Sequence, residues 1–307
     1  MKGNGSIHIL ANVSSGQGQA QTIAHKAQER CRELGLPVHL HLARHRKAMP
    51  GALDRACSGA RRDGGRVLVI GGDGTVRAVS ERLAGTDIVM AVIPTGTFNF
   101  FARDLDIPLD PDAALALALE GEVRAVDLGR VNEHRFIINA SFGLYARLIR
   151  AREQHTRRFG RHRLVAIVST LLTLLGGYRP LRLELERGGE SRVLYSPMVF
   201  VGINAVQLRG VDLEMGACID RRRLGVIVMK PVQRWALFRL TVRGLLHRLR
   251  DERSLERFCA EHLSIRPERR SMTVVLDGER LRIRTPLEFG IEYGALKVVA
   301  APKTEDA

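Results

Sequence analysis

The first third of the chain alternates short apolar runs with longer segments in which apolar residues recur every three or four positions. The short runs are typical of buried strands, and the longer segments have the periodicity of helices that cover a sheet. This alternation predicts a parallel, doubly wound sheet. The predicted strands are Ile7–Val13, Val38–Leu42, Val67–Ile70 and Ile88–Ile93. The predicted helices are Ala20–Leu34, Pro50–Arg62, Thr75–Leu83 and Ala113–Leu119.

From about residue 123 the apolar segments stay short, but helices no longer separate them regularly. Two helical segments interrupt this part, a strongly basic one at Tyr145–Leu175 and another at about Val232–Leu249. We therefore expect a second, mostly antiparallel β-rich domain that is similar to a sandwich. Its predicted strands are Arg135–Ala140, Leu181–Glu186, Met198–Ile203, Leu224–Met229, Thr273–Leu276 and Leu281–Arg284.

Small-residue turns follow three of the predicted parallel strands, at Ser14–Gly18, Gly71–Thr75 and Gly96–Asn99. Ligands of doubly wound sheets bind at the carboxyl ends of the strands, so three turns at that edge predict a binding site. A single turn of this kind is equally typical of a hairpin or a tight strand–helix connection. Neither G-x-x-x-x-G-K-[ST] nor a G-x-G-x-x-G after a strand occurs, which argues against a P-loop or a dinucleotide fold.

The residue types in these turns favour the binding of a nucleotide triphosphate. Gly71, Gly72 and Gly74 allow positive φ and a close approach of the backbone to a ligand. Successive N–H groups and the start of a helix near Thr75 would form an anion site. Asp73 adds a carboxylate that suits a Mg²⁺ ion bound with the phosphates. The candidate nucleotide-binding residues are Asn12, Ser14, Ser15, Gly16, Gly71, Gly72, Asp73, Gly74, Thr75, Gly96, Thr97 and Asn99.

The formal net charge of the 307-residue chain is +15, which favours an anionic partner such as a phosphate substrate or an acidic membrane surface. A solvated, arginine-rich surface is the alternative explanation. The basic helix at Arg234–Arg250 can lie on anionic lipid or pack on the core with a solvated face. No nucleic-acid recognition motif accompanies the charge, so we expect no nucleic-acid partner. Homodimer formation is left open.

Cysteine usage and hydropathy indicate a soluble, cytoplasmic protein that can contact the inner membrane face peripherally. The four cysteines include no C-x-x-C pair, which is typical of reduced thiols rather than of a disulfide framework. The N-terminus runs directly into Ile7–Leu10 and leaves no room for a signal peptide. The most apolar run, Leu164–Leu175, is shorter than the roughly 18 residues of a membrane span.

Five motifs in one order carry a resemblance to a known family: Gly71–Thr75, Gly96-Thr-x-Asn99 with Phe101-Ala-Arg103, Val126–Gly129, Phe136-x-x-Asn139-x-Ser141-x-Gly143, and Leu276–Glu279. From near residue 7 to near residue 301 they resemble the diacylglycerol kinase catalytic-domain family, in its bacterial branch of soluble lipid kinases related to diacylglycerol and sphingosine kinases. The first motif is shared with NAD kinases, whereas the later ones point to lipid kinases.

The resemblance implies a nucleotide-binding domain of the NAD-kinase and diacylglycerol-kinase type at residues 1–122. A final strand at about 290–303 would return to this domain, and residues 123–289 would form a β-rich lipid-substrate domain, with the site between the two. The implied cofactors are ATP and Mg²⁺, and the implied partner is a diacylglycerol-like lipid.

The resemblance also assigns roles to four carboxylates. Asp73 would bind the metal, Asp127 would lie near the domain junction, and Glu279 would accept the proton of the lipid hydroxyl with support from Asp277. Neighbouring carboxylates raise each other's pKa, which helps a general base to work near neutral pH. A hairpin turn is the structural alternative for Asp277-Gly278, and the hairpin can itself present the carboxylates.

Several positions depart from the family pattern. Phe100 stands where many relatives have an acidic residue. Arg221 stands after Asp220 where relatives have a second aspartate that binds a structural metal, so we predict that this metal site is lost, with the charge of Arg221 in its place. His39 and His41 share one strand face, but no third ligand has matching spacing, and we do not expect them to bind a metal.

We therefore expect an ATP-dependent lipid kinase of phospholipid metabolism that phosphorylates a hydroxyl of diacylglycerol or a related lipid alcohol. One alternative is a soluble small-molecule kinase of the NAD-kinase type, which should have an Asn-Glu pair in place of Gly96–Asn99. The other is a nucleotide-binding regulator without catalytic activity, which Phe100 and Arg221 favour.

Overall fold

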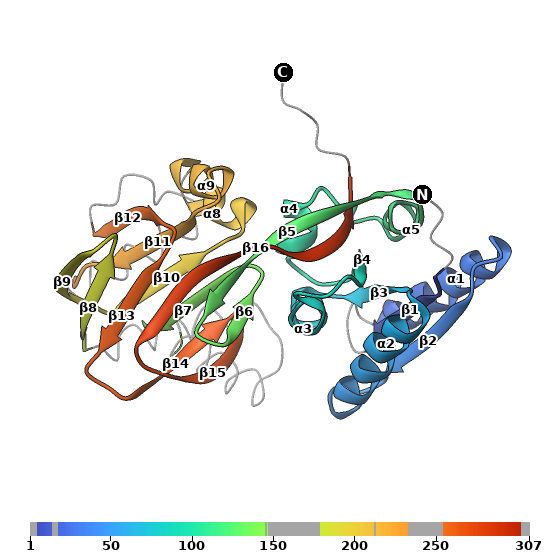
Figure 1. Ribbon diagram of the computed structural model, residues 1–307, viewed down its shortest axis with the longest axis horizontal. Coiled ribbons are helices and arrows are strands. Elements are labelled where there is room, and N and C mark those ends of the chain that lie inside the picture. The colour runs from blue at the N-terminus through green and yellow to red at the C-terminus, as the bar shows by residue number, and fades with distance from the viewer. Residues whose placement is uncertain are drawn as a thin grey trace, which may run out of the picture. The chain divides into compact units, whose positions relative to one another are not determined.

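Figure 1 shows the computed structural model of the chain, which describes residues 5–13, 18–144, 146, 179–211, 213–232 and 254–301. The chain divides into two compact units. Unit 1 comprises Met1–Leu128 and Glu292–Ala307, and unit 2 comprises Gly129–Ile291. Three features expected from the sequence lie outside the described residues, wholly or for the most part: the turn residues Ser14, Ser15 and Gly16 and the helices at 145–175 and 232–249.

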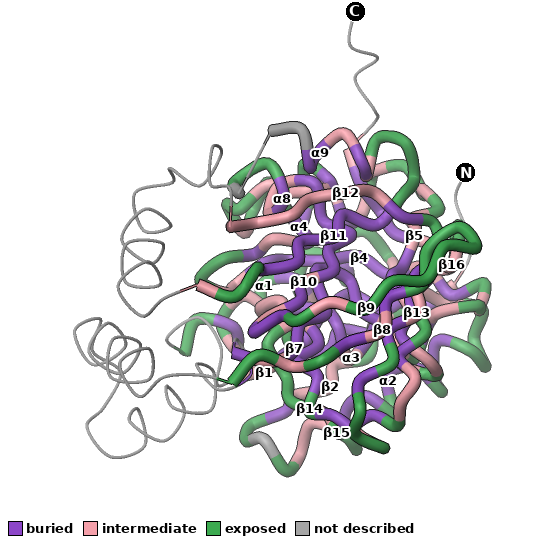
Figure 2. The backbone as a smooth tube through the Cα atoms, turned by 90° about the vertical axis from the view of Figure 1, so that its left-hand side faces the viewer, coloured by how far each residue is buried: buried purple, intermediate pink, exposed green. Residues whose placement is uncertain are grey.

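Unit 1 is built on four parallel strands in the order β2-β1-β3-β4. Successive residues of a strand point to opposite faces, and both Ile9 and Leu10 of β1 are fully buried. Both faces of the sheet are therefore covered at β1, β3 and β4, whose residues are mostly buried (Figure 2), whereas the edge strand β2 is partly exposed. The predicted parallel sheet is confirmed. The strands are β1 (Ile7–Asn12), β2 (Val38–Ala43), β3 (Arg66–Gly71) and β4 (Val89–Pro94).

The helices of unit 1 connect these strands, and two of them begin or end at residue types that commonly occupy helix termini. Pro50 stands in the first turn of α2, and Gly64 follows the helix in the left-handed region at φ 62°. The carboxylate of Asp110 accepts hydrogen bonds from the first amides of α5. The helices are α1 (Gln19–Glu33), α2 (Met49–Asp63), α3 (Asp73–Leu83), α4 (Phe100–Asp104) and α5 (Pro111–Glu120).

Two long strands, β5 (Glu122–Val131) and β16 (Leu287–Ala300), belong in part to each unit. β16 pairs in parallel with β4, where Lys297 lies opposite Val89, and antiparallel with β13 (Leu263–Pro267), where Leu263 lies opposite Phe289. The last strand of the chain thus completes the parallel sheet that the first strands begin.

Unit 2 is a pair of antiparallel sheets. One has the order β12-β11-β10-β7-β14-β15, and the other continues from β16 through β13 and β8 to β9. Phe142 and Val226 of the first sheet share a buried cluster with Leu183 and Phe289 of the second, which is the packing of a sandwich. The remaining strands are β6 (His134–Phe136), β7 (Asn139–Gly143), β8 (Leu181–Arg187), β9 (Glu190–Ser196), β10 (Met198–Gly202), β11 (Leu224–Met229), β12 (Leu255–Ala260), β14 (Ser271–Leu276) and β15 (Glu279–Arg284).

Two helices of unit 2, α8 (Ala205–Val211) and α9 (Leu213–Asp220), lead to a correction concerning the cysteines. Cys218 of α9 is disulfide-bonded to Cys259 of β12, so the expectation of four reduced thiols is wrong for this pair. The 41-residue separation gave no local signal, because the pairing of β11 with β12 and the packing of α9 bring the two residues together. Cys31 and Cys57 are free and buried, and burial raises the pKa of the Cys57 thiol to about 11.

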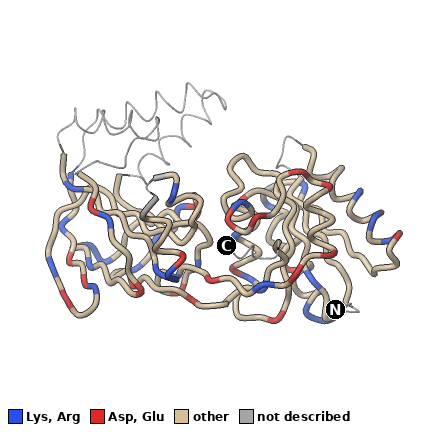
Figure 3. The backbone as a smooth tube through the Cα atoms, turned by 90° about the horizontal axis from the view of Figure 1, so that it is seen from above, with Lys and Arg blue, Asp and Glu red and all other residues tan. Residues whose placement is uncertain are grey.

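Along the described chain, Lys and Arg positions are interspersed with Asp and Glu positions (Figure 3). Ion pairs between exposed side chains, such as Lys26–Asp112 and Arg223–Glu261, account for part of this pattern. In the part of the chain that the structure describes, no helix has the length and apolar character needed to cross a membrane.

Candidate active site

The turn between β3 and α3 does not have the backbone conformation that its glycines suggest. Gly72 is extended, with φ −90° and ψ −179°, and α3 begins at the next residue, Asp73. None of Gly71, Gly72 and Gly74 has a φ in the left-handed region, so the expected positive φ is wrong. The strand passes into the helix through one extended residue and needs no left-handed turn.

These glycines are required instead by close packing between two turns. A Cβ atom on Gly72 would lie 2.9 Å from the Cα atom of Gly96, and one on Gly96 would lie 2.7 Å from the Cα atom of Gly72. A Cβ atom on Gly71 would meet the side chain of Thr75 at 2.7 Å. The backbones of the turns after β3 and β4 are therefore in contact. This agrees with the prediction that these turns lie at one edge of the sheet.

Gly74 differs from the other glycines, because a Cβ atom there would meet no atom of the described chain within 4 Å. It is the second residue of α3, where backbone N–H groups have no partner within the helix. The first turn of α3 thus keeps a bare backbone surface that internal packing does not require. Such a surface suits the close approach of a phosphate group.

Asn99 shapes the turn after β4. Its side-chain Oδ1 accepts a hydrogen bond from the Gly96 amide at 2.9 Å, and its Nδ2 donates to the Gly96 carbonyl oxygen at 3.0 Å. The residue is buried, has φ 51° and immediately precedes α4. Asn99 therefore holds the turn closed, while the neighbouring Thr97 is exposed.

Asp73 connects the two turns through its carboxylate. Its Oδ1 accepts a hydrogen bond from the amide of Phe101 at 3.3 Å, at the start of α4. Burial raises the pKa of Asp73, and hydrogen bonds from the amides of Phe101, Phe100 and Asn99 offset part of this effect. A buried carboxylate of this kind fits a Mg²⁺ ion, since a hard cation would offset the cost of keeping the group ionised.

The end of β1 joins the same region. The side-chain Nδ2 of Asn12 donates to Oγ1 of Thr75 at 3.1 Å, so the last residue of β1 is attached to the first turn of α3. Of the predicted nucleotide-binding residues that the structure describes, Asn12 and those after β3 and β4 thus gather at the carboxyl edge of the parallel strands.

Sequence reasoning missed an aromatic pair beside these turns. The rings of Phe98 and Phe100 are stacked with centroids 5.5 Å apart, and Phe98 is 56% exposed. The run Phe98-Asn-Phe-Phe101 was the available signal, but we considered Phe100 only as a departure from the family pattern. The position that lacks an acidic side chain thus belongs to an exposed apolar surface.

In unit 2, Asp277 and Gly278 form the two-residue turn of the β14–β15 hairpin, which confirms the structural prediction for this pair. Both residues have positive φ, at 48° and 87°, as the favoured Asp-Gly hairpin turn requires. Glu279 is the first residue of β15 and is exposed.

The carboxylate of Asp277 accepts three backbone hydrogen bonds. Its Oδ2 accepts from Ile137 and its Oδ1 accepts from Ile138 and Asn139, each at 2.8 Å, and the Asp277 amide donates to the Asn139 carbonyl oxygen at 2.9 Å. These bonds attach the hairpin to the start of β7. Asp277 therefore positions the segment that carries Glu279, and its role toward Glu279 itself stays a prediction.

Two buried polar atoms of β7 lie in the same sheet. Oδ1 of Asn139 and Oγ of Ser141 have no hydrogen-bond partner in the described part of the chain, while Nδ2 of Asn139 donates to Gln207 at 2.9 Å. Buried polar atoms without partners are rare in native proteins, and each calls for an explanation such as a ligand or water. Both residues belong to a motif that the sequence singled out without assigning it a role.

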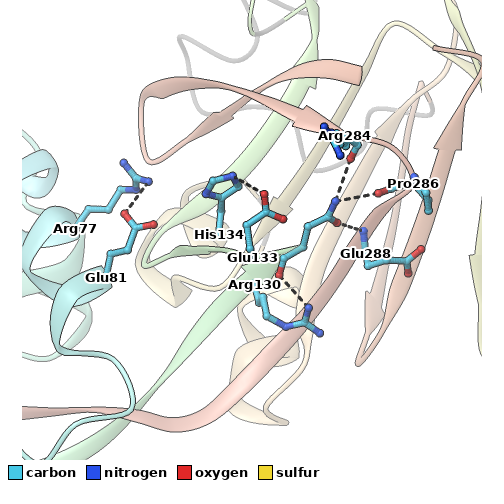
Figure 4. A network of polar contacts seen from close by, with 9 residues as sticks. Arg77, Glu81, Arg130, Glu133, His134, Arg284, Pro286 and Glu288 are labelled. Carbon is cyan, nitrogen blue, oxygen red and sulfur yellow. Dashed lines mark hydrogen bonds and ion pairs between the residues drawn. The ribbon is translucent and has the colours of Figure 1, made fainter. Parts of the chain in front are cut away.

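Asp127 lies on β5, next to the last residue of this part of unit 1, and its Oδ1 accepts a hydrogen bond from the Gly294 amide of β16 at 2.8 Å. Beyond the end of β5, Asn132 donates to the carbonyl oxygens of Arg284 and Pro286 and accepts from the amide of Glu288 (Figure 4). Both side chains thus fix the long strands by backbone contacts.

Asp220 does not pair with the adjacent Arg221 in the contacts that the structure gives for its carboxylate. Both oxygens instead accept hydrogen bonds from Arg209, at 3.2 and 3.4 Å. Arg209 thus supplies the positive charge beside Asp220 that we had expected from Arg221.

Comparisons with known proteins show that the first part of the chain is similar to lipid kinases. Residues 6–131 match the family model of the diacylglycerol kinase catalytic domain. A diacylglycerol kinase of Mycobacterium tuberculosis is 35% identical over 136 residues, which is 42% of this chain and 41% of that protein. A probable lipid kinase YegS of Escherichia coli is 36% identical over 117 residues, or 36% of this chain and 38% of that one. The matched segments thus span about two fifths of these relatives.

Similarity to solved structures extends over nearly the whole chain. A structure from Bacillus anthracis covers 97% of both chains with a TM-score of 0.71 and 19% identity. Another, described as a diacylglycerol kinase of the same organism, covers 97% of both with a TM-score of 0.66 and 18% identity. At this identity the likeness concerns the fold. Residues 6–131 thus resemble the diacylglycerol kinase catalytic domain, and the family match is limited to this part of the chain.

Proposed function

We propose that this protein is an ATP- and magnesium-dependent lipid kinase, which transfers the γ-phosphate to a hydroxyl of diacylglycerol or a related lipid alcohol. The observation that carries the proposal is the bare first turn of α3 at Gly74, beside two turns that pack backbone to backbone at Gly72 and Gly96. The match of residues 6–131 to the diacylglycerol kinase catalytic-domain model supports the phosphotransferase class.

On the nucleotide side, the positive N-terminal end of α3 and the backbone of its first turn at Gly74 bind the phosphates. The Asn12–Thr75 bond and the Asn99 side chain keep the surrounding turns in place. Asp73 would hold Mg²⁺, which supplies charge neutralisation at the phosphates. The aromatic surface at Phe98 gives the nucleotide an apolar neighbour.

On the acceptor side, Glu279 is the general base. It takes the hydroxyl proton as the acceptor oxygen forms its bond to the γ-phosphorus, and the bond from that phosphorus to the leaving oxygen breaks to release ADP. Asp277 positions Glu279 by anchoring the hairpin. The unpartnered Asn139 Oδ1 and Ser141 Oγ suit a polar group of the acceptor or a water that orients it.

A nucleotide-binding regulator is the second candidate, because the position expected to be acidic is Phe100, stacked on Phe98. A regulator would bind ATP without transferring phosphate. Peripheral contact with anionic lipid at the inner membrane face belongs to the proposed enzyme, since its substrate would reside there.

The test is transfer of label from γ-labelled ATP, with magnesium, to bacterial lipid extract in detergent micelles, resolved by thin-layer chromatography. We expect a labelled lipid whose rate of formation falls about 10²–10⁴-fold in Glu279→Gln, as loss of a general base predicts, with ATP affinity unchanged. Glu190→Gln on exposed strand β9 is the matched control and should retain full activity.

Labelled NAD instead of labelled lipid would favour the small-molecule kinase. ATP binding without transfer to lipid or NAD would favour the regulator, and failure to bind ATP would contradict the proposal at its first step.

A further inference from the structure

A cluster of three histidines and one aspartate lies in unit 1, away from the glycine turns along the strands. His8 and His39 are the second residues of the parallel strands β1 and β2, opposite each other in register, whereas the turns follow the carboxyl ends of the strands. Asp63, the last residue of α2, and His41 of β2 complete the cluster. Neither the proposed kinase reaction nor its substrates use these residues.

The potential ligand atoms already lie at distances close to those of a metal site. His8 Nε2 is 3.2 Å from Asp63 Oδ2, and His39 Nε2 is 3.8 Å from the same oxygen. The ligand atoms of all three residues lie within 4.8 Å of one another. Tetrahedral Zn²⁺ with bonds of about 2.0–2.1 Å places its ligand atoms about 3.3 Å apart, so only small side-chain adjustments are needed.

Neighbouring groups orient these ligands. His8 Nε2 contacts Asp63 Oδ2 at 3.2 Å and Ser6 Oγ at 2.9 Å, and a metal ion would take the place of the proton on this nitrogen. His8 Nδ1, which is 3.2 Å from His41 Nε2, can then donate to that nitrogen. Ser6 Oγ donates to Asp63 Oδ2 at 3.0 Å. A metal-binding histidine usually donates its second ring N–H to such a partner, which fixes its tautomer and orientation.

The imidazole of His8 packs closely against the backbone of α2. A Cβ atom on Gly59 of α2 would lie 2.2 Å from Cε1 of His8, so the helix tolerates only glycine against this ring. The His8 ring is stacked on that of His39 with centroids 4.7 Å apart. His8 is buried, whereas the side chains of His39 and Asp63 are 54% and 35% exposed, which leaves the site open to solvent.

We propose that His8 Nε2, His39 Nε2 and Asp63 Oδ2 bind a divalent transition-metal ion of the zinc class, with water in the remaining position. Two imidazoles and one carboxylate suit Zn²⁺, Co²⁺, Ni²⁺ or Fe²⁺, whereas Mg²⁺ and Ca²⁺ prefer oxygen ligands. This ion is therefore distinct in kind and place from the magnesium expected at Asp73.

A metal ion bound at this site would join three elements that otherwise contact one another only through packing and hydrogen bonds. The ion would tie the edge strand β2 to β1 and to the end of α2. Metal that binds the folded state alone stabilises it by mass action, so the unfolding temperature should rise with metal concentration. The predicted role is structural, and kinase turnover is not its readout.

The test is titration of chelator-treated, untagged full-length protein with Co²⁺, followed by visible absorption, and with Zn²⁺, followed by calorimetry. We expect one tight equivalent per chain, tetrahedral Co²⁺ bands that Zn²⁺ abolishes, and a higher unfolding temperature with Zn²⁺. His39→Asn and Asp63→Asn remove exposed ligands without opening the core, and each should weaken binding by more than the 10–100-fold typical of losing an outer partner. His25→Asn, exposed on α1, is the matched control.

His41→Gln should weaken binding by about 10–100-fold while the Co²⁺ bands persist, as expected for an orienting group. The proposal fails if wild-type protein and His25→Asn bind no Co²⁺ or Zn²⁺, or if His39→Asn binds as tightly as they do. Octahedral Co²⁺ bands that are insensitive to Asp63→Asn would also overturn it.

Discussion

The turns at Asp73 and Asp277 each aim a carboxylate at backbone amides, but they satisfy that carboxylate to different degrees. Asp277 has three amide donors at 2.8 Å. Asp73 also accepts hydrogen bonds from the amides of Phe101, Phe100 and Asn99, but the Phe101 contact is 3.3 Å long and burial still raises the Asp73 pKa. The Asp277 carboxylate therefore serves the fold, whereas the proposed function gives the Asp73 carboxylate a cation.

The largest effect on stability is expected from Asp277→Ala. This change leaves the amides of Ile137, Ile138 and Asn139 buried without an acceptor, at a cost of about 3–5 kcal/mol in the free energy of unfolding. Chemical denaturation measures it, with the exposed Asp112→Ala as control. A loss as small as that of the control would mean that Asp277 is not an anchor.

Asp73→Asn should have the opposite profile, with phosphate transfer reduced about 10²–10³-fold, as for loss of one electrostatic group, and little loss of stability. Asparagine can still accept the bond from Phe101 but cannot bind Mg²⁺ as an anion. Magnesium-dependent turnover and thermal unfolding of the same preparation separate the two effects. Wild-type turnover in this variant would remove Asp73 from the proposed site.

The pH dependence of stability should distinguish the same pair. Because the Asp73 pKa is raised in the folded state, the folded chain binds more protons than the unfolded chain between the ordinary and the raised value, and stability falls as pH increases through that window. Asp73→Asn should abolish this part of the decline. Unfolding free energies from pH 4 upward test it, and parallel curves for variant and wild type would contradict the assignment.

Effects on stability smaller than that of Asp277→Ala are expected within the glycine turn. Gly72→Ala should destabilise the protein by about 1–3 kcal/mol, because its methyl group would meet Gly96. Gly74→Ala should be neutral or stabilising by up to about 1 kcal/mol, as in other helices, yet weaken ATP binding about tenfold, or about 1.4 kcal/mol. Calorimetric ATP titration of both variants would show whether the open surface at Gly74 is a ligand surface.

Local patterns allowed prediction of the parallel strands, because each was a short apolar run such as Val67–Ile70, observed as β3. Strands without such a run were missed: β9 is an exposed edge strand with mainly polar residues, and β12 mixes charged and apolar side chains. Their pairing, and not their own sequence, makes them strands.

For the candidate sites, contiguous motifs such as Gly71–Thr75 and the hairpin at Asp277 could be recognised from the sequence. Contacts between distant segments could not. Asp277 contacts Ile138 across 139 positions, and His8 contacts Asp63 across 55. His39 and His41 therefore looked incomplete as metal ligands until the fold added residues from β1 and α2.

The return of β16 to β4 has a consequence for biosynthesis. Lys297 and Val298 pair with β4, and the buried side chains of Leu296, Val298 and Val299 follow unit 2 in the chain. Residues 1–128 are synthesised before unit 2 but cannot complete their sheet until β16, which follows unit 2, has been made. We therefore expect unit 1 to complete its fold after unit 2, with the edge of β4 in need of protection from other chains during that interval.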